Sequence, residues 1–220
     1  MARAPDSNSR YRHVDFGKKP KLDRLRTDQV IWGIIAANVA VFVAWQRPEL
    51  LMFMAKHFLV SVESVTNQRI WTLLTSEFSH RDAMHLFFNM FGLYVFGRPI
   101  GQVRGPWEVL QVYVVGAILA SVAHVMFTGW FGDGVPALGA SGAIMALAAY
   151  FGAMYPDRTL IVLFFPMPAA AAVALFILVD VFGLATPGSP IAHAAHLGGA
   201  AYGLAYYQLV VEPQLRGRGR

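Results

Sequence analysis

Cysteine is absent from the chain, which excludes disulfide bonds, thiolate metal sites and a cysteine nucleophile. Charged residues are also scarce, at 14% of the sequence against about 25% in a typical soluble domain. Hydrophobic residues make up 56% of the chain, and the mean hydropathy is +0.46. This balance predicts an integral membrane protein, and 220 residues suffice for one bundle of several spans.

The basic residues of the chain gather at its two ends. Of 18 lysines and arginines, eight precede the first apolar run, and Arg216, Arg218 and Arg220 follow the last one. This arrangement indicates positive-inside topology and attraction to anionic lipid. Nucleic-acid binding is disfavoured, because only Tyr11 and Phe16 are aromatic residues interleaved with the N-terminal basic residues.

The sequence therefore predicts a basic cytoplasmic tail at residues 1–28, a membrane domain at residues 29–211 and a second basic cytoplasmic tail at residues 212–220. The first tail is polar and lacks the pattern of a cleavable signal peptide. The expected location is a bacterial plasma membrane with both termini cytoplasmic. A mitochondrial inner membrane stays open as an alternative, because the N-terminal segment is rich in arginine.

Termini on one side of a membrane require an even number of spans, and the apolar runs supply six. They are bounded by proline, glycine and charged residues and lie near residues 30–45, 83–96, 107–127, 140–154, 169–184 and 190–211. Several are shorter than the ~20 residues that cross a bilayer core unaided. The expected fold class is an all-α membrane protein, a bundle of six transmembrane helices.

The connection between the first two spans, residues 46–81, differs from the others. It contains an apolar, amphipathic stretch at residues 50–60 and a polar stretch at residues 63–68. The acidic and basic residues in and next to this connection balance. We expect it to form an outer loop that lies in the membrane interface.

Three polar residues lie at matching depth in this topology. Spans two, four and six all run from outside to inside, so His85, Ser141 and His196, near their starts, come to similar heights. A serine becomes a nucleophile when a base takes its proton, and His196 is the candidate base for Ser141. His85 and Asn89 are four residues apart, so they share one face of the second span.

The spacing of glycines favours contact between spans four and six. His196, Gly199 and Gly203 share one face of the sixth span, and the two glycines allow a neighbouring helix to approach closely. The expected neighbour is span four, with Ser141 and Gly142. A Gly-x-Ser-Gly sequence alone is more often a packing device, but its alignment with the histidines and Asn89 favours catalysis.

Four motifs occur together and in order between about residues 68 and 203. They are Arg69 with Trp71, His85-x-x-x-Asn89, Gly139-Ala140-Ser141-Gly142 and Ala195-His196-x-x-Gly199-x-x-x-Gly203. With these motifs the chain resembles the rhomboid intramembrane serine proteases. The resemblance implies a six-helix bundle with Ser141 and His196 as a catalytic dyad. It further implies an oxyanion hole made by His85, Asn89 and the Ser141 backbone N–H.

The resemblance also implies what the protein acts on. Rhomboid proteases cleave transmembrane protein substrates near their outer ends, within the lipid bilayer and without a cofactor. A helical substrate must unwind before its carbonyl reaches the serine, so helix breakers near the outer end of its span, and a small residue before the scissile bond, should favour cleavage.

Small residues around the nucleophile and base are expected to shape the site. They are Gly139, Ala140, Gly142, Gly199 and Gly203, together with Met145, which stands where rhomboids commonly have a tyrosine that stacks on the catalytic histidine. A thioether can still contact a ring, although more adaptably. A second departure is Gly101, at a position where the family often has a glutamate.

Other polar residues receive structural interpretations. His193, one turn nearer the outside than His196, is expected at the rim or in a hydrogen bond, and His80 is expected to steady the outer loop. His124, late in the third span, is expected near the opposite surface as a satisfied core histidine. Asp180 reaches the outer end of span five, and this depth leaves a position near the site open. The preferred interpretation is a structural hydrogen bond or polar cap, which leaves packing to orient His196.

The predicted function is intramembrane serine proteolysis, and two alternatives stay open. The first is a catalytically inactive rhomboid-like protein that binds membrane clients, although the intact Ser141 and His196 pair argues against it. The second is a small transporter, disfavoured because the charged residues cluster at helix ends rather than along a central path. No metal is expected, since the histidines come without a His-Glu-x-x-His motif or an acidic ligand set.

Overall fold

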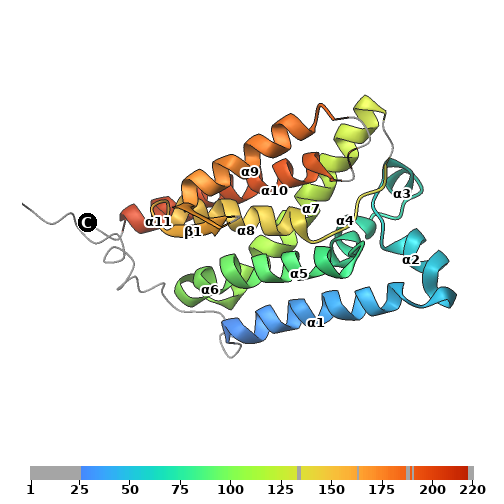
Figure 1. Ribbon diagram of the computed structural model, residues 1–220, viewed down its shortest axis with the longest axis horizontal. Coiled ribbons are helices and arrows are strands. Elements are labelled where there is room, and N and C mark those ends of the chain that lie inside the picture. The colour runs from blue at the N-terminus through green and yellow to red at the C-terminus, as the bar shows by residue number, and fades with distance from the viewer. Residues whose placement is uncertain (1–25, 133–134, 163, 187–188, 190, 218–220) are drawn as a thin grey trace, which may run out of the picture.

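The computed structural model describes residues 26–132, 135–162, 164–186, 189 and 191–217. Within these residues, six helices form a bundle, with α7 crossing it obliquely (Figure 1). They are α1 (Thr27–Trp45), α5 (Ala83–Gly92), α7 (Pro106–Phe131), α8 (Ser141–Met154), α9 (Ala169–Gly183) and α10 (His193–Tyr206). These helices lie where the sequence has its apolar runs. Most of the predicted N-terminal tail, residues 1–25, lies outside the described residues.

Two of these helices continue through a π turn. α5 passes through η5 (Leu93–Gly97) into α6 (Arg98–Arg104), and α10 passes through η6 (Tyr207–Val211) into α11 (Glu212–Gly217). The segment at residues 212–220, expected from the sequence to be a tail, therefore begins as a continuation of the last helix.

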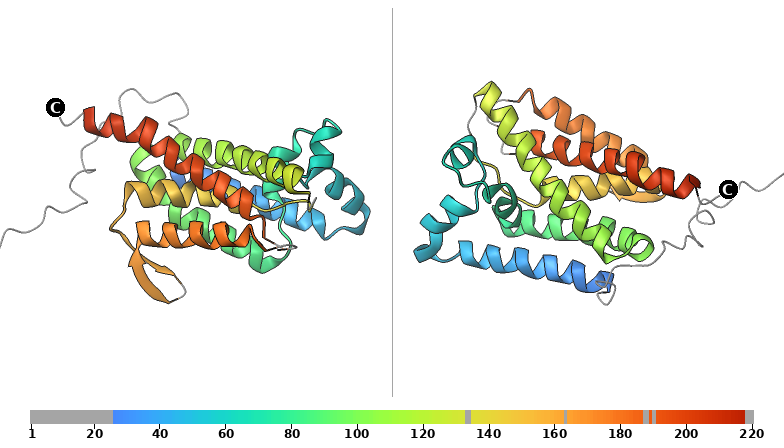
Figure 2. Two further views of the ribbon diagram at one scale, coloured as in Figure 1. Left: turned by 90° about the horizontal axis from the view of Figure 1, so that it is seen from above. Right: turned by 180° about the vertical axis from the view of Figure 1, so that it is seen from behind.

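α8 is the central helix of the bundle. It lies against α5, α7, α9 and α10 (Figure 1 and Figure 2), and all of its residues except Ser141 and Ala153 are buried. A helix that is covered on every side must be apolar all round, and the sequence of α8 is of this kind. Its N-terminus, which holds Ser141, is the part that opens toward a cavity.

α10 packs on α8 through two glycines. A Cβ on Gly199 would collide with the backbone carbonyl of Gly142, and a Cβ on Gly203 would collide with that of Ala146. The two backbones are therefore as close as glycine alone permits, in the phase that the glycine spacing predicts. This contact brings the first turn of α10, with His196, beside the first turn of α8.

The connection between α1 and α5 is made of short helices. They are η3 (Pro48–Leu50), α2 (Leu51–His57), α3 (Val62–Thr66), α4 (Thr72–Thr75) and η4 (Ser76–Phe78). Large apolar side chains of α2 are exposed, Met52 at 84% among them. That this connection lies in a membrane interface stays a prediction.

The segment that enters α8 is held by the same connection. Ala137 forms an isolated antiparallel bridge with Val60, and the Gly139 backbone N–H donates to the Ser76 carbonyl at 3.0 Å. The backbone before Ser141 is therefore tied to η4 and to the segment after α2.

One element departs from the all-helical expectation. Strands β1 (Thr159–Val162) and β2 (Phe165–Pro168) pair antiparallel between α8 and α9, and the hairpin projects sideways from the bundle (Figure 2). The predicted fold class, an all-α membrane protein, contains no strand. The two strands are too short, and β2 too rich in proline, to give a recognisable strand pattern.

Two helices of the described chain, α1 and α7, are long and apolar enough to cross a membrane by length and composition. α8 and α9 are shorter apolar helices. The outer surface of the bundle carries many exposed large apolar side chains, Trp32, Phe88 and Leu178 among them. A surface of this kind is typical of contact with lipid or with another protein.

Candidate active site

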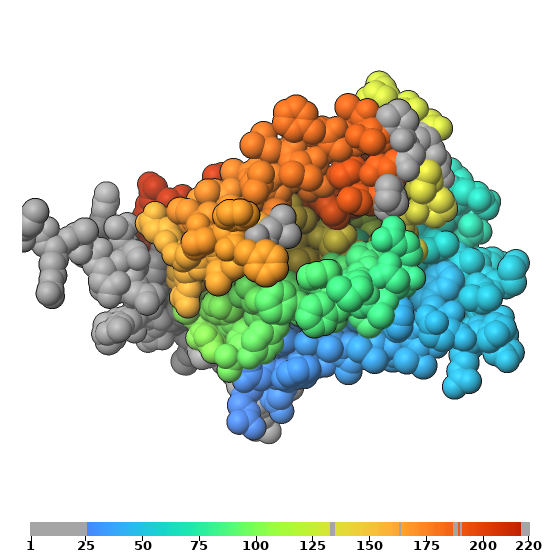
Figure 3. Space-filling view, viewed as in Figure 1, coloured from blue at the N-terminus to red at the C-terminus, as the bar shows by residue number. Residues whose placement is uncertain are grey.

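A cavity of about 730 Å³ lies at the end of the bundle where α8 begins. In the space-filling view, α8 is visible at the bottom of a recess between α5, in green, and α9, in orange (Figure 3). The polar side chains that line the cavity come from four helices and the segments beside them: Arg81, Asp82, His85, Asn89, His124, Thr128, Ser141, Thr186, Ser189, His193 and His196.

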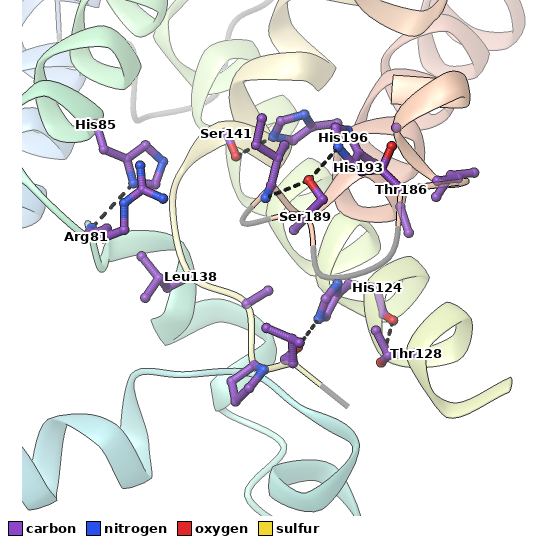
Figure 4. Close-up of a pocket in the computed structure, with 18 of the residues that line it drawn as sticks. Arg81, His85, His124, Thr128, Leu138, Ser141, Thr186, Ser189, His193 and His196 are labelled. Atoms are coloured by element: carbon purple, nitrogen blue, oxygen red, sulfur yellow. Dashed lines mark hydrogen bonds between the residues drawn. The ribbon is translucent and has the colours of Figure 1, made fainter. Parts of the chain in front are cut away.

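Ser141 and His196 form a hydrogen bond in this cavity. The Ser141 Oγ lies 2.7 Å from the His196 Nε2, although 55 residues separate the two in sequence (Figure 4). Ser141 is the first residue of α8, and His196 lies in the first turn of α10. A hydroxyl within hydrogen-bond distance of an imidazole nitrogen is the arrangement that a nucleophile and its general base require.

A carboxylate holds the other side of the His196 ring. The Asp180 Oδ1 lies 2.9 Å from the His196 Nδ1, and the Asp180 side chain is buried, at 6% exposed. A carboxylate can only accept, so Nδ1 carries the hydrogen and Nε2 is left to accept from Ser141. The expectation that packing alone orients His196 is therefore wrong. The depth of Asp180 at the end of α9 was the one signal in the sequence for this contact.

The same carboxylate oxygen holds a second histidine. The His193 Nδ1 lies 2.7 Å from the Asp180 Oδ1, and the His193 Nε2 lies 3.0 Å from the Ser189 Oγ (Figure 4). Asp180, His193 and His196 offer three potential metal-ligand atoms within 4.8 Å of one another. In the structure, both histidines hydrogen-bond to the Asp180 carboxylate through their Nδ1 atoms. The three residues could ligate a metal by their chemistry, but their geometry is that of a hydrogen-bond network.

His85 and Asn89 lie on the other side of Ser141. The Asp82 carboxylate caps α5 by accepting from the His85 backbone N–H at 2.8 Å, and the Asn89 side-chain amide donates to the His85 carbonyl at 2.8 Å. The amide of Asn89 has two hydrogens, so this bond occupies one of them. Both side chains line the cavity with Ser141, and the resemblance to rhomboid proteases implies that they are oxyanion donors.

The backbone beside the nucleophile requires glycine. Gly139 has φ +119°, and a Cβ there would lie 2.9 Å from the His85 Nε2 and closer still to its ring carbon. Gly139 thus lets the segment before Ser141 pass directly against His85. Ala140 is fully buried, and a Cβ on Gly142 would collide with Ala120 of α7.

Met145 lies one turn after the nucleophile in α8. It is 9% exposed and packs in an apolar cluster with Ala149, Val173 and Ala200. The cluster joins α8 to α9 and α10. The thioether thus fills space in the bundle beneath the first turn of α8, where the family commonly has a tyrosine.

Two further histidines, His80 and His124, also lie near this end of the bundle. His80 is buried in the loop before α5, and its ring lies edge-on to that of His85, with 5.0 Å between centroids. His124 is not near the opposite surface, because α7 runs toward the end of the bundle that holds Ser141. It lines the same cavity, and its Nε2 lies 3.0 Å from the Val135 carbonyl oxygen.

Residues 67–213 match the family model described as the Rhomboid domain, which is more than half of the chain. The chain belongs to the rhomboid family. This family generally includes serine intramembrane proteases, and the order of the four sequence motifs agrees with the membership.

Curated rhomboid proteins are similar along most of the chain. RHOMBOID-like protein 12, mitochondrial, of Arabidopsis thaliana is 37% identical over 200 residues, which cover 84% of this chain and 59% of that protein. Rhomboid protein 1, mitochondrial, of Saccharomyces cerevisiae is 31% identical over 185 residues, covering 80% and 52%. Presenilin-associated rhomboid-like protein, mitochondrial, of Homo sapiens is 35% identical over 184 residues, covering 81% and 47%. The chain thus spans about half the length of the curated relatives it matches.

The names of these relatives contradict one expectation. The expected location is a bacterial plasma membrane with cytoplasmic termini, whereas the curated relatives are mitochondrial rhomboid proteins. The bacterial assignment is therefore wrong. The error has a physical reason, since basic tails indicate the side of a membrane on which they lie and carry little information about which membrane it is.

Proposed function

We propose that this rhomboid is an intramembrane serine endopeptidase that cleaves transmembrane protein substrates with Ser141 as nucleophile and His196 as general base. The observation that carries the proposal is the 2.7 Å contact between the Ser141 Oγ and the His196 Nε2, in a cavity that also holds hydrogen-bond donors. A catalytically inactive, client-binding role is the less favoured alternative, because the nucleophile and its base are both present and in contact.

Acylation uses these groups in sequence. The His196 Nε2 takes the hydroxyl proton as the Ser141 Oγ attacks the scissile carbonyl carbon, and a tetrahedral intermediate forms. The Ser141 backbone N–H and the side chains of Asn89 and His85 stabilise the negative charge on the former carbonyl oxygen by donating hydrogen bonds. His196 then gives its proton to the amide nitrogen, the carbon–nitrogen bond breaks, and the first product leaves an acyl ester on Ser141.

Deacylation uses the same groups, with a water molecule as the nucleophile and Ser141 as the leaving group. His196 takes a proton from a water molecule that attacks the ester carbonyl, and it returns a proton to the Ser141 Oγ as the ester bond breaks. In both halves His196 passes through the imidazolium form. We assign Asp180 as a positioning residue that holds the ring in the required tautomer and stabilises this positive charge at 2.9 Å.

The proposal places the bundle in a membrane with six spans. α8 has 14 residues, which rise about 21 Å, so it is shorter than a bilayer core is thick. The longer α7 and the other helices surround it. Ser141 would then lie below the membrane surface, where backbone outside a helix is tolerated because it lines a wet cavity.

Labelling with a serine-reactive fluorophosphonate tests the nucleophile directly. We expect the purified protein in detergent or liposomes to be labelled and to cleave a model transmembrane substrate, and we expect Ser141→Ala to lose both activities. Ser61→Ala is the matched control, because Ser61 caps α3 away from the cavity and its loss should leave both activities intact. Cleavage that survives in Ser141→Ala protein would rule out this nucleophile.

A further inference from the structure

A second acidic side chain, Glu77, lies close to Ser141. Glu77 belongs to η4, is 3% exposed, and faces a small internal cavity of about 10 Å³ that Ser141 and Gly139 also line. The mechanism described above does not use it. A buried acid beside a nucleophile requires an explanation, because burial of an unpaired charge is costly.

The carboxyl group of Glu77 is directed at the N-terminus of α8. Its Oε1 accepts from the Ser121 hydroxyl of α7 at 3.2 Å and lies 3.6 Å from where a Cβ on Gly142 would be. The Ala143 backbone N–H also donates to the carboxyl group. Its Oε2 is buried without a hydrogen-bond partner among the described residues. The Glu77 carboxyl group therefore lies at the N-terminal turn of α8, next to the peptide groups that follow Ser141.

No positive charge balances Glu77 in the part of the chain that the structure describes. Tyr113 and Ser121 face it from α7, Ser141 and the first N–H groups from α8, and Ser76 from its own turn. α4 has no titratable side chain, and the only acid in α1, Asp28, pairs with Arg98 at the far end of the bundle. His196 is already paired with Asp180.

The nearby loop histidine does not supply the missing charge. Burial and the neighbouring His85 lower the pKa of His80 to about 4, so His80 is neutral at pH 7. Burial also raises the pKa of Glu77 from 4.5 to about 8, and the hydrogen bonds from Ser121 and Ala143 offset this only in part. Glu77 therefore carries a proton at neutral pH.

We propose that Glu77 is an electrostatic control on the oxyanion site, active as a neutral carboxylic acid and inhibitory as a carboxylate. The proposal rests on the serine protease function assigned above. An ionised Glu77 would place a negative charge at the N-terminus of α8, where the Ser141 backbone N–H must stabilise the developing oxyanion. Because the Glu77 side chain is buried, its negative charge would be poorly screened and would repel the developing oxyanion, and both charges would compete for the same helix dipole. The neutral acid imposes no such penalty.

The rate of substrate cleavage against pH tests this control. We expect the wild-type rate to fall about tenfold between pH 7 and pH 9, the loss for one required proton with a midpoint near pH 8. Glu77→Gln copies the neutral acid and cannot ionise, so its rate at pH 9 should stay close to its own rate at pH 7. Glu49→Gln, an exposed acid in η3, should keep the wild-type alkaline fall.

A second variant guards against misfolding of Glu77→Gln. Ser121→Ala removes the hydroxyl that favours the carboxylate form, so the alkaline fall should move to higher pH. An alkaline fall that is identical in wild type and Glu77→Gln, or folded Glu77→Gln protein that is inactive at every pH, would overturn the proposal.

Stability against pH separates this proposal from the protease assignment. Glu77 binds its proton more tightly in the folded state than in the unfolded state, so the folded state should lose stability as pH rises from about 4.5 to about 8. We expect Ser141→Ala protein, which has no nucleophile, to show this loss in Tm, and Ser141→Ala with Glu77→Gln to lack it. If Tm falls with rising pH but the wild-type protein hydrolyses no substrate, the protease assignment is wrong while the protonation of buried Glu77 is supported. If the two Tm profiles coincide, the Glu77 proposal fails by itself.

Discussion

The Nδ1 of His196 lies 2.9 Å from the Oδ1 of Asp180, across the contact between α10 and α9. The imidazole is therefore held at both nitrogens, by a carboxylate on one side and by the Ser141 hydroxyl on the other. A ring held in this way has one tautomer and one orientation before substrate arrives, which lowers the reorganisation needed for proton transfer.

This contact predicts a large effect of Asp180→Asn. An asparagine amide can present a donor to Nδ1, which would shift the ring hydrogen to Nε2 and remove the acceptor for Ser141. We expect kcat to fall by about 10²- to 10⁴-fold with little change in KM. Asp157→Asn, an exposed acid before β1, is the control and should retain wild-type kcat. An unchanged kcat in folded Asp180→Asn protein would remove Asp180 from the positioning role.

The cluster of Asp180, His193 and His196 also makes a prediction about metals. Because its ligand atoms hydrogen-bond to one another, we expect dialysis against EDTA to leave substrate cleavage unchanged. Elemental analysis of the purified protein before and after dialysis provides the check. Activity that is lost with EDTA and restored by Zn²⁺ would instead assign the three residues as metal ligands.

Asn89 should contribute to the rate more than to substrate binding. Asn89 lines the cavity with Ser141 and is an oxyanion donor in the proposed mechanism, so Asn89→Ala is expected to lower kcat by about 10²- to 10³-fold and to change KM little. His85→Ala should act in the same direction. Asn67→Ala, at the C-terminal end of α3, is the control. A loss confined to KM would mean that this face of α5 binds substrate and does not stabilise the transition state.

The positions of the helices could be predicted because apolar runs end at proline, glycine or charge. Their direction then gave the depth of His85, Ser141 and His196, and depth alone brought these three to one end of the bundle, whereas His124 was assigned to the wrong end. The glycine spacing then indicated how α10 is rotated about its own axis. Gly199 and Gly203 face α8, and His196 lies on the same face of α10. Two side chains on neighbouring helices meet when they lie at the same depth and when their helix faces point toward each other.

Asp180 and Glu77 show where this reasoning stops. Asp180 had the right depth, but α9 carries no glycine pair to indicate which of its faces meets α10, so the contact with His196 was not predicted. Glu77 lies in a connection whose charges balance, and the prediction for it was an outer loop in the membrane interface. A backbone hydrogen bond from Gly139 to Ser76 holds this part of the connection against the segment before α8, and such a long-range contact leaves no periodic signal in the sequence.

Gly203 should be required for the contact that brings the nucleophile and base together. A Cβ at this position collides with the Ala146 carbonyl, so Gly203→Ala must push α10 away from α8 or strain both helices. Overpacking of this kind costs about 1–3 kcal/mol or more, and we expect a lower Tm together with slower cleavage. Gly33→Ala in α1 is the matched control, because a Cβ there meets nothing within 4 Å. Equal Tm values for the two variants would contradict the close approach.

The final prediction concerns the substrate, and it follows from the position of Ser141 in the wall of a cavity. A helical substrate keeps its carbonyls in backbone hydrogen bonds, so a segment must unwind before one of them can reach the Ser141 Oγ. Glycine lowers the cost of unwinding by ~1 kcal/mol relative to alanine, and proline lowers it by ~3 kcal/mol.

Replacing one glycine by leucine near the end of the substrate span that lies level with Ser141 should therefore slow cleavage by about fivefold, and replacing a proline should slow it further. The control substrate carries the same helix breakers at the opposite end of its span, where unwinding exposes no carbonyl to Ser141, and we expect no rescue from them. Cleavage rates of the parent substrate, its two variants and the control substrate at saturating concentration provide the measurement. Equal rates would show that unwinding does not limit the reaction and that contacts outside the cavity select the substrate.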